Sequence, residues 1–184
     1  MEEKLTIWSY LEPFLLTREP LHLADISQRL KRPHPTVRQY LHLFEQDGIL
    51  TKTIKGRLTL YALNRSSPLL IDTLVLGEKE RLLRVCKKNL LLGELNSFLH
   101  QSLSENHKAL IFGSSVSDFK KAHDVDLLVV GKQISVAVFE NKFNIKIHLI
   151  HVNALSTVTD PLREEIRKRH LLIQGSEELL TWLL

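Results

Sequence analysis

Two short apolar runs in the C-terminal half of the chain most constrain its fold. The first run, 108–112, ends in a Gly-Ser pair, and the second, 127–130, follows the triplet Asp124-Val125-Asp126. Runs of this length that are rich in apolar and β-branched residues predict buried strands. Because alternate residues of a strand project from one face, we expect Asp124 and Asp126 to point together while Val125 faces the core. The sequence therefore predicts a small sheet with paired carboxylates on one face.

Carboxylates held this close repel each other unless a cation lies between them. A divalent metal ion whose coordination shell is completed by phosphate oxygens is a common solution. Gly113 lets the backbone turn tightly and approach a ligand, and Ser114 adds a hydroxyl beside backbone amides. Together these residues predict a site for a metal–nucleotide complex, with Asp124 and Asp126 as the metal ligands.

The first third of the chain shows helical patterns followed by a hairpin pattern. Apolar residues recur at helical spacing in residues 4–16, 23–30 and 35–47. Two prolines within residues 33–35 separate the second helix from the third, because proline is tolerated only in the first turn of a helix. Alternating residues predict two strands, 49–54 and 58–63, joined by a turn at residues 55–57.

This order of elements closely resembles a winged helix-turn-helix domain. The resemblance implies that helix 35–47 enters the major groove of DNA and that the hairpin tip contacts the neighbouring backbone. The residues expected to face DNA are His34, Thr36, Arg38, Gln39 and His42, with Lys55 and Arg57 on the hairpin. Arg38 and Gln39 suit base edges, whereas Lys55 and Arg57 suit phosphates. A polar face that serves protein–protein contact is the alternative.

Leucines dominate the segment that follows the hairpin. Residues 65–68, Arg-Ser-Ser-Pro, have the composition of a linker. Helical periodicity over residues 78–91 and 93–104 predicts two helices, and Gly77 is expected to divide the segment. A homodimer could form on this leucine-rich connector, although packing on a sheet explains the same pattern.

The Gly-Ser and Asp-Val-Asp groups together resemble the nucleotidyltransferase superfamily of DNA polymerase beta, and especially its minimal branch. The matching residues are Phe112-Gly113-Ser114, then nine intervening residues, then Asp124-Val125-Asp126-Leu127. The resemblance covers roughly residues 93–176, and the helix and strand expected at 162–175 are similar to the end of such domains. It implies that Mg²⁺ or Mn²⁺ on the aspartates binds a nucleoside triphosphate whose phosphates Gly113 and Ser114 hold. A nucleoside monophosphate would then pass to a protein or small-molecule acceptor as pyrophosphate leaves.

The sequence departs from this family at two places. Active members carry a third carboxylate on a following strand, but the matching strand, 143–153, contains no Asp or Glu. His148 is the best candidate for that position and for a metal ligand, and Lys146 is second. The family's Ala-Arg-Gly run is replaced by residues 115–118, Ser-Val-Ser-Asp, so Lys120 and Lys121 are the nearest basic substitutes for its arginine.

Two functions therefore stay open from the sequence, a DNA-binding nucleotidyltransferase and a regulator whose catalytically degenerate domain binds nucleotide or dimerises. A third is an antitoxin-type partner of a separate toxin. The single cysteine and the absence of a signal peptide or a long apolar run favour a cytoplasmic protein without a membrane segment.

The predicted fold class is α+β. A winged helix-turn-helix over residues 1–66 and a helical connector over 67–92 precede an α/β nucleotidyltransferase-like domain with a small mixed sheet over 93–184. Lysine and arginine exceed Asp and Glu in residues 1–65 by ten to seven, which is where a DNA-binding surface is expected.

Overall fold

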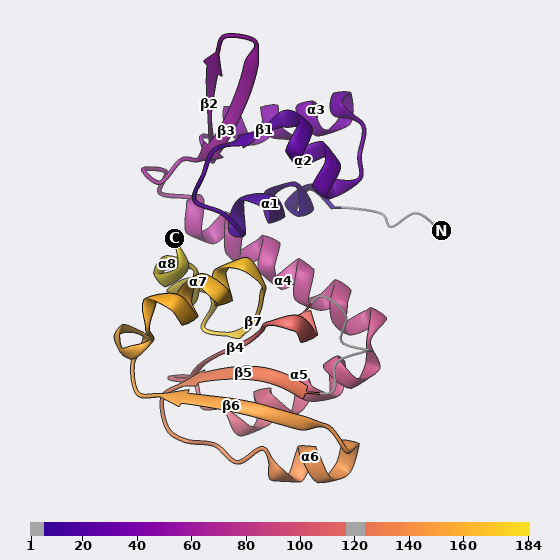
Figure 1. The fold of residues 1–184 in the computed structure, drawn as a ribbon, viewed down its shortest axis with the longest axis vertical. Helices are drawn as coiled ribbons and strands as arrows, with labels where there is room; N and C mark the ends of the chain where they lie inside the picture. The colour runs from indigo at the N-terminus through magenta and orange to yellow at the C-terminus, as the bar shows by residue number, and fades with distance from the viewer. Residues whose placement is uncertain (1–5, 117–123) are drawn as a thin grey trace. The chain divides into compact units, whose positions relative to one another are not determined.

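The computed structural model describes residues 6–116 and 124–184 and has the predicted α+β fold (Figure 1). The chain forms two compact units, one of residues 1–77 with Leu184 and one of residues 78–183. The division falls inside the long helix α4, Leu70–Lys88. Ser117, Asp118, Lys120 and Lys121, which the sequence analysis considered, lie outside the described residues.

The first unit combines short helices with a three-stranded antiparallel sheet of order β1-β3-β2. Its elements before α4 are η1 (Ile7–Leu11), α1 (Glu12–Leu15), β1 (Leu21–His22), α2 (Leu23–Leu30), α3 (His34–Gln46), β2 (Leu50–Lys55) and β3 (Leu58–Leu63). The two helices and the hairpin predicted between residues 23 and 63 are confirmed to within about two residues. The short strand β1, which pairs with β3, was not predicted.

Prolines set where the helices of this unit begin. Pro33 is the N-cap of α3 and Pro35 lies in its first turn, where a missing N–H costs nothing. Lys31, with a φ of 52°, ends α2 in the left-handed region. The single helix predicted over 4–16 is wrong in detail. Because Pro13 cannot continue a helix, a 3₁₀ turn ends at Leu11 and α1 starts afresh with proline in its first turn.

The prediction that Gly77 divides the middle segment is also wrong. Helix α4 passes through Gly77 without a break, and α5 follows as Leu90–Ser102. Gly77 is buried, and a Cβ there would lie 3.7 Å from the carbonyl oxygen of Trp8. This is an ordinary van der Waals distance, so a side-chain methyl would fit there; the glycine neither ends the helix nor is required by packing.

The second unit is built on a four-stranded mixed sheet of order β6-β5-β4-β7. Strands β5 and β6 are parallel, and β4 is antiparallel to both β5 and β7. Its elements after α5 are β4 (Lys108–Phe112), η2 (Ser114–Val116), β5 (Asp124–Val130), α6 (Ala137–Phe143), β6 (Lys146–Val152), η3 (Leu155–Thr157), α7 (Asp160–Lys168), β7 (His170–Gln174) and α8 (Ser176–Leu183). The strand predicted from residue 143 begins three residues later, because residues 137–143 form α6, the crossover that parallel strands require.

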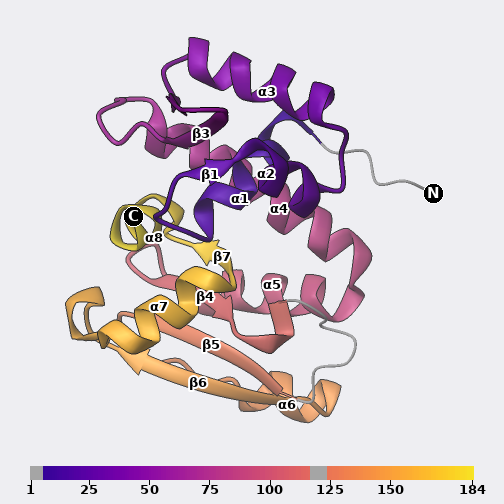
Figure 2. The same ribbon diagram turned by 45° about the horizontal axis from the view of Figure 1, so that its top comes forward.

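The two faces of this sheet have different neighbours. One face packs against α5 and α6, which Figure 2 shows from a second angle, in a core that contains Leu95, Leu127 and Phe139. On the other, α8 packs against β4 and β7. Because Val125 and Leu127 belong to the first core, Asp124 and Asp126 lie on the opposite face of β5, as predicted. No helix among the described residues is long and apolar enough to cross a membrane.

Candidate functional site

Helix α3 has an apolar face and a polar face. Val37, Leu41 and Phe44 are buried on the apolar side, where the aromatic ring of Phe44 lies 6.2 Å from that of Trp8. Toward solvent the helix exposes Arg38 and Gln39. This division follows from the 3.6-residue period, because the three buried residues recur at spacings of three and four.

The other residues predicted to face DNA on α3 differ in their surroundings. His34 is exposed at the first turn, whereas Thr36 is half-buried. His42 is exposed, and its Nδ1 lies 3.3 Å from Oε2 of Glu45, which in turn lies 3.8 Å from Nζ of Lys52. Arg38 and Gln39 therefore offer side chains that are better placed to reach a ligand than that of His42.

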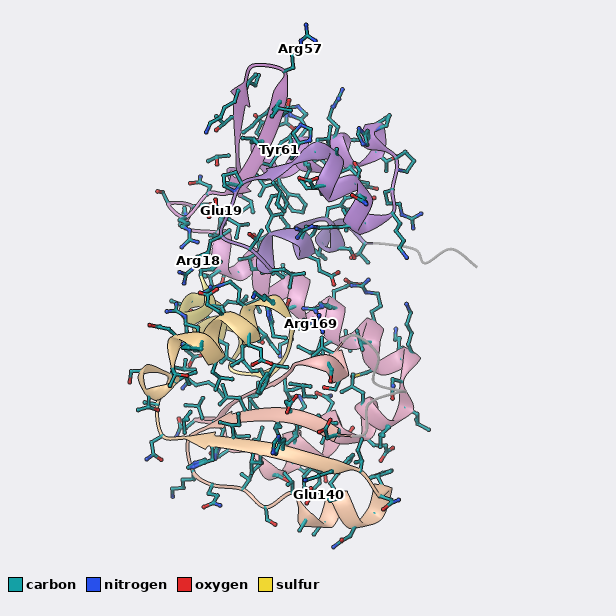
Figure 3. All side chains as sticks on the ribbon, viewed as in Figure 1. Arg18, Glu19, Arg57, Tyr61, Glu140 and Arg169 are labelled. Atoms are coloured by element: carbon teal, nitrogen blue, oxygen red, sulfur yellow. The ribbon has the colours of Figure 1, made fainter. Side chains whose placement is uncertain are left out.

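The hairpin β2–β3 extends beyond the helices of its unit. All residues from Thr51 to Leu58 are exposed, and Gly56 takes a φ of 61° in the turn. Figure 3 shows Arg57 projecting from the tip of this hairpin, and Lys55 precedes the turn. The hairpin thus carries two exposed cations at its turn, as the sequence analysis predicted.

Two tyrosines, half-buried Tyr40 of α3 and buried Tyr61 of β3, pack within the first unit. Tyr40 of α3 stacks on Tyr10, with ring centroids 4.1 Å apart. On β3, Tyr61 is buried, and burial, assisted by the Glu45 carboxylate, raises the pKa of its phenol above the usual 10.

In the second unit, Gly113 brings the backbone against Asp126. Strands β4 and β5 pair Phe112 with Asp126, so that Gly113 directly follows this pair at the end of β4. Its φ is 77°, and a Cβ at this position would lie 2.5 Å from Oδ2 of Asp126. Only glycine fits here without displacing the carboxylate, which accounts for the residue type that the motif requires.

The strand next to β5 places His148 and Lys146 beside the two aspartates. In the parallel pairing Asp126 is opposite His148, and Asp124 is opposite Lys146. His148 Nδ1 lies 3.5 Å from Asp126 Oδ1. The sequence analysis named His148 and Lys146 for the position of the missing third carboxylate, and both lie on the strand beside the two aspartates. His148 lies next to Asp126, which is the less exposed aspartate.

This donor set does not fit a centre of two metal ions. A lysine ammonium beside Asp124 competes with a cation, and histidine is a weaker ligand for Mg²⁺ than a carboxylate. Within residues 6–116 and 124–184, no three His, Cys, Asp or Glu side chains are grouped so that they could hold a metal ion. The assignment of Asp124, Asp126 and His148 as metal ligands stays a prediction.

A cleft of about 390 Å³ opens at the Gly113 turn. Its lining residues are Gly113, Ser114, Asp126, Glu165, Lys168 and Arg169. The backbone N–H of Gly113 donates to the carbonyl oxygen of Arg169 at 3.2 Å, which joins the end of α7 to the turn. The side chains of Lys168 and Arg169 are exposed at this cleft. Two cations therefore lie close to the backbone of the Gly113 turn, which a ligand in the cleft can approach.

The sequence analysis missed Glu165, Lys168 and Arg169 as residues of this cleft. They come from α7 and the residue after it, far from Gly113 along the chain, and reach it because β7 pairs with β4. The available signal was the Lys168-Arg169 pair directly before a predicted strand. The basic residues of this cleft thus come from a different part of the chain than the loop after Ser114.

Two other histidines line a separate cleft of about 450 Å³, next to Gly131. His107 makes hydrogen bonds with the Ser104 hydroxyl at 2.7 Å and with the Lys132 carbonyl oxygen at 3.0 Å. His151 donates to the carbonyl oxygen of Gly131 at 2.6 Å. These contacts give both rings a structural role, because they tie the ends of β5 and β6 to the neighbouring loops.

A buried charged group lies where β7 begins. Arg81 donates to Glu78 at 3.2 Å, and His170 Nε2 lies 3.8 Å from the same carboxylate oxygen. His170 is fully buried, and this burial lowers the pKa of its imidazole below the usual 6.5. Its Nδ1 donates to the carbonyl oxygen of Ile166 at 3.0 Å, so the neutral ring is held in one orientation.

Comparison with known proteins places the chain in no family. No protein-family model matches it, and no curated protein matches it. Among solved structures, it is similar to wild-type ZitR of Lactococcus lactis in complex with DNA, with 16% sequence identity and a TM-score of 0.33. This match covers 55% of the present chain and 75% of ZitR. A likeness this weak bears on neither family nor function.

Proposed function

We propose that this chain is a DNA-binding regulator that contacts DNA through α3 and the β2–β3 hairpin. The observation that carries the proposal is the division of α3 into a buried apolar face and an exposed face with Arg38 and Gln39, beside a hairpin tipped by Arg57. A helix with this division can enter the major groove while an exposed basic hairpin contacts the phosphate backbone. The match in element order to a winged helix-turn-helix supports the same function.

The residues divide into two roles on this model. Arg38 and Gln39 have the planar hydrogen-bonding groups that read guanine and adenine edges. Lys55 and Arg57 carry positive charge at an exposed turn, which suits phosphate contacts that position the protein without reading sequence. Both roles require accessible side chains, and all four are exposed.

Fluorescence anisotropy with random and promoter DNA tests these roles. We expect Arg38→Ala to lower affinity for a preferred site about 5- to 150-fold and to relax its sequence preference. Lys55→Ala and Arg57→Ala should weaken binding to all sequences and each reduce the salt slope by about one. Lys132→Ala, which removes an exposed lysine from the other unit, is the matched control. Unchanged affinity in all three test variants would contradict the proposal.

We further propose that the cleft at Gly113 binds the phosphates of a nucleotide. The observation that favours this second function is the cleft at the Gly113 turn, which is lined by the exposed residues Ser114, Lys168 and Arg169. The Gly113 N–H already donates to the Arg169 carbonyl oxygen, so the groups offered to phosphate are the Ser114 hydroxyl and the two cations. A metal ion, if bound, would rest on Asp126 and His148 and neutralise phosphate charge. Because the donors do not fit a pair of metal ions, we favour nucleotide binding over nucleotidyl transfer.

Titration with a fluorescent ATP analogue, with and without Mg²⁺ or Mn²⁺, tests this cleft. We expect Lys168→Ala and Arg169→Ala each to weaken binding about tenfold, close to the loss of one charge-assisted hydrogen bond. Lys142→Ala, an exposed lysine on α6, is the control. Binding that all these variants retain would place the nucleotide elsewhere. Transfer of labelled nucleotide that Asp126→Asn abolishes would instead establish the enzyme.

A further inference from the structure

Helix α4 exposes leucines at a spacing of seven residues. Leu76 and Leu83 are 51% and 61% exposed, in a helix that otherwise buries its apolar side chains Leu70, Leu74 and Leu82. Leu69, directly before α4, and Leu90, at the start of α5, have the same spacing in the sequence and are 55% and 82% exposed, but they lie outside α4 because the extended Asn89 separates the two helices. A repeat of seven keeps exposed side chains on one stripe of a helix, and such a stripe is the usual seam for a second helix.

Two opposite charges border this stripe. Asp72 lies four residues before Leu76, and Lys87 lies four residues after Leu83. At 3.6 residues per turn the four side chains fall within about 60° around the helix axis, so they form one narrow face. Asp72 and Lys87 are both exposed, and all four residues belong to this single helix. We call them the α4 seam.

The α4 seam is complementary to itself. The leucine pair and the charged pair are centred on the same point of the chain, between Lys79 and Glu80, and so is the outer pair Leu69 and Leu90. A two-fold axis through that point, perpendicular to the helix, would place Leu76 against Leu83 of the partner subunit. The same axis would place Asp72 against the partner's Lys87. Residue contacts that are repeated in both directions define an isologous dimer interface.

We propose that the chain forms a homodimer in which α4 packs antiparallel against α4 of a second copy along the α4 seam. Charge decides the direction. A parallel pair would place Asp72 against Asp72 and Lys87 against Lys87, and like charges at such positions destabilise a helix pair. In the antiparallel pair both charged contacts are attractive, and the apolar contacts lie between them, away from solvent. The partner is therefore another copy of this chain.

Sedimentation velocity of the full chain over a range of concentrations is the first test. We expect a dimer, and we expect Leu76→Glu and Leu83→Glu each to raise its Kd on the order of 100-fold, because each change occurs twice in a two-fold interface. Val138→Glu is the matched control, since Val138 is 70% exposed on α6, outside the seam. A chain that is monomeric at every concentration, or a dimer that neither leucine variant weakens, would overturn the proposal.

Charge reversal tests the pairing itself. Asp72→Lys should raise the Kd of the dimer about tenfold, and adding Lys87→Asp to the same chain should restore it, because both contacts are then attractive again with opposite sign. A double variant that dimerises no better than Asp72→Lys alone would count against the antiparallel register. Circular dichroism of each variant verifies that the helix is intact.

Cross-linking separates the two directions. In a Cys86→Ser background, a mixture of the Leu76→Cys and Leu83→Cys variants should form a disulfide-linked dimer under mild oxidation, whereas each variant alone should not. Leu76→Cys that links to itself would indicate parallel helices and would overturn the proposal. These readouts need neither DNA nor nucleotide, so their failure is distinguishable from a failure of the proposed function.

Discussion

Replacement of Gly113 by alanine should damage both the stability of the second unit and its cleft. An L-residue in the left-handed region costs about 1–2 kcal/mol, and Gly113 has a φ of 77°. The new Cβ would also lie 2.5 Å from Asp126 Oδ2, so the carboxylate must rotate away and leave His148. Loss of this solvent-accessible contact adds less than about 1 kcal/mol. Together these losses come to roughly 2 kcal/mol, or about 4–8 °C in Tm for a chain of this length.

Urea unfolding measures this loss, and Gly56→Ala is its control. Gly56 has a φ of 61°, but a Cβ there would meet nothing within 4 Å, so this variant should lose only about 1 kcal/mol. The fluorescence of Trp8 reports on unfolding of the first unit, and that of Trp182 reports on the second. Replacing one tryptophan with phenylalanine isolates the fluorescence of the other.

A double variant tests whether the contact with Asp126 is the cause. Asp126→Ala removes the oxygen that the new Cβ would meet, so Gly113→Ala should cost less in that background than in the natural chain. Nucleotide affinity should fall about tenfold in Gly113→Ala, because the displaced carboxylate moves within the cleft. The reasoning is refuted if the two changes are additive and Gly113→Ala costs no more than Gly56→Ala.

Three further predictions concern stability. Leu127→Ala should lower the free energy of unfolding by about 2–5 kcal/mol in urea titrations, because its side chain is fully buried in the core of the sheet. Asn89→Ala should cost about 1 kcal/mol, because the Asn89 side chain accepts from the backbone N–H of Leu92 at 3.1 Å as the N-cap of α5; Asn89→Ser should retain most of that stability. Stability should also fall as the pH drops below 6.5, because His170 stays neutral when folded and binds a proton when unfolded. His170→Gln should remove up to about 1.4 kcal/mol per pH unit of that slope, and an unchanged slope would exclude His170 as its source.

Local patterns predicted the elements whose contacts are local. Helix α3 lies within a residue of its predicted range, because proline fixes its start and the spacing of Val37, Leu41 and Phe44 fixes its face. The sides of Asp124 and Asp126 also followed from strand alternation alone. The alternation of strand 143–153 identified His148 and Lys146 without knowledge of the sheet order.

Features that depend on distant contacts could not be predicted in this way. Gly77 has the appearance of a helix breaker, but α4 runs through it, because the helix is stabilised by buried leucines on both sides of the glycine, at Leu74 and Leu82. The cationic part of the cleft depends on the pairing of β7 with β4, and a sequence pattern does not specify which strands pair. Helix α6 is short and has a mixed composition, so its periodicity was too weak to detect.

The position of the division within α4 matters for producing the first unit alone, the unit that we propose contacts DNA. Leu70 and Leu74 are buried and belong to the first unit, although they lie beyond its hairpin. A fragment that stops at residue 66 would lack both of these buried leucines. A fragment that extends through Gly77 would keep both leucines. We expect the shorter fragment to precipitate on expression.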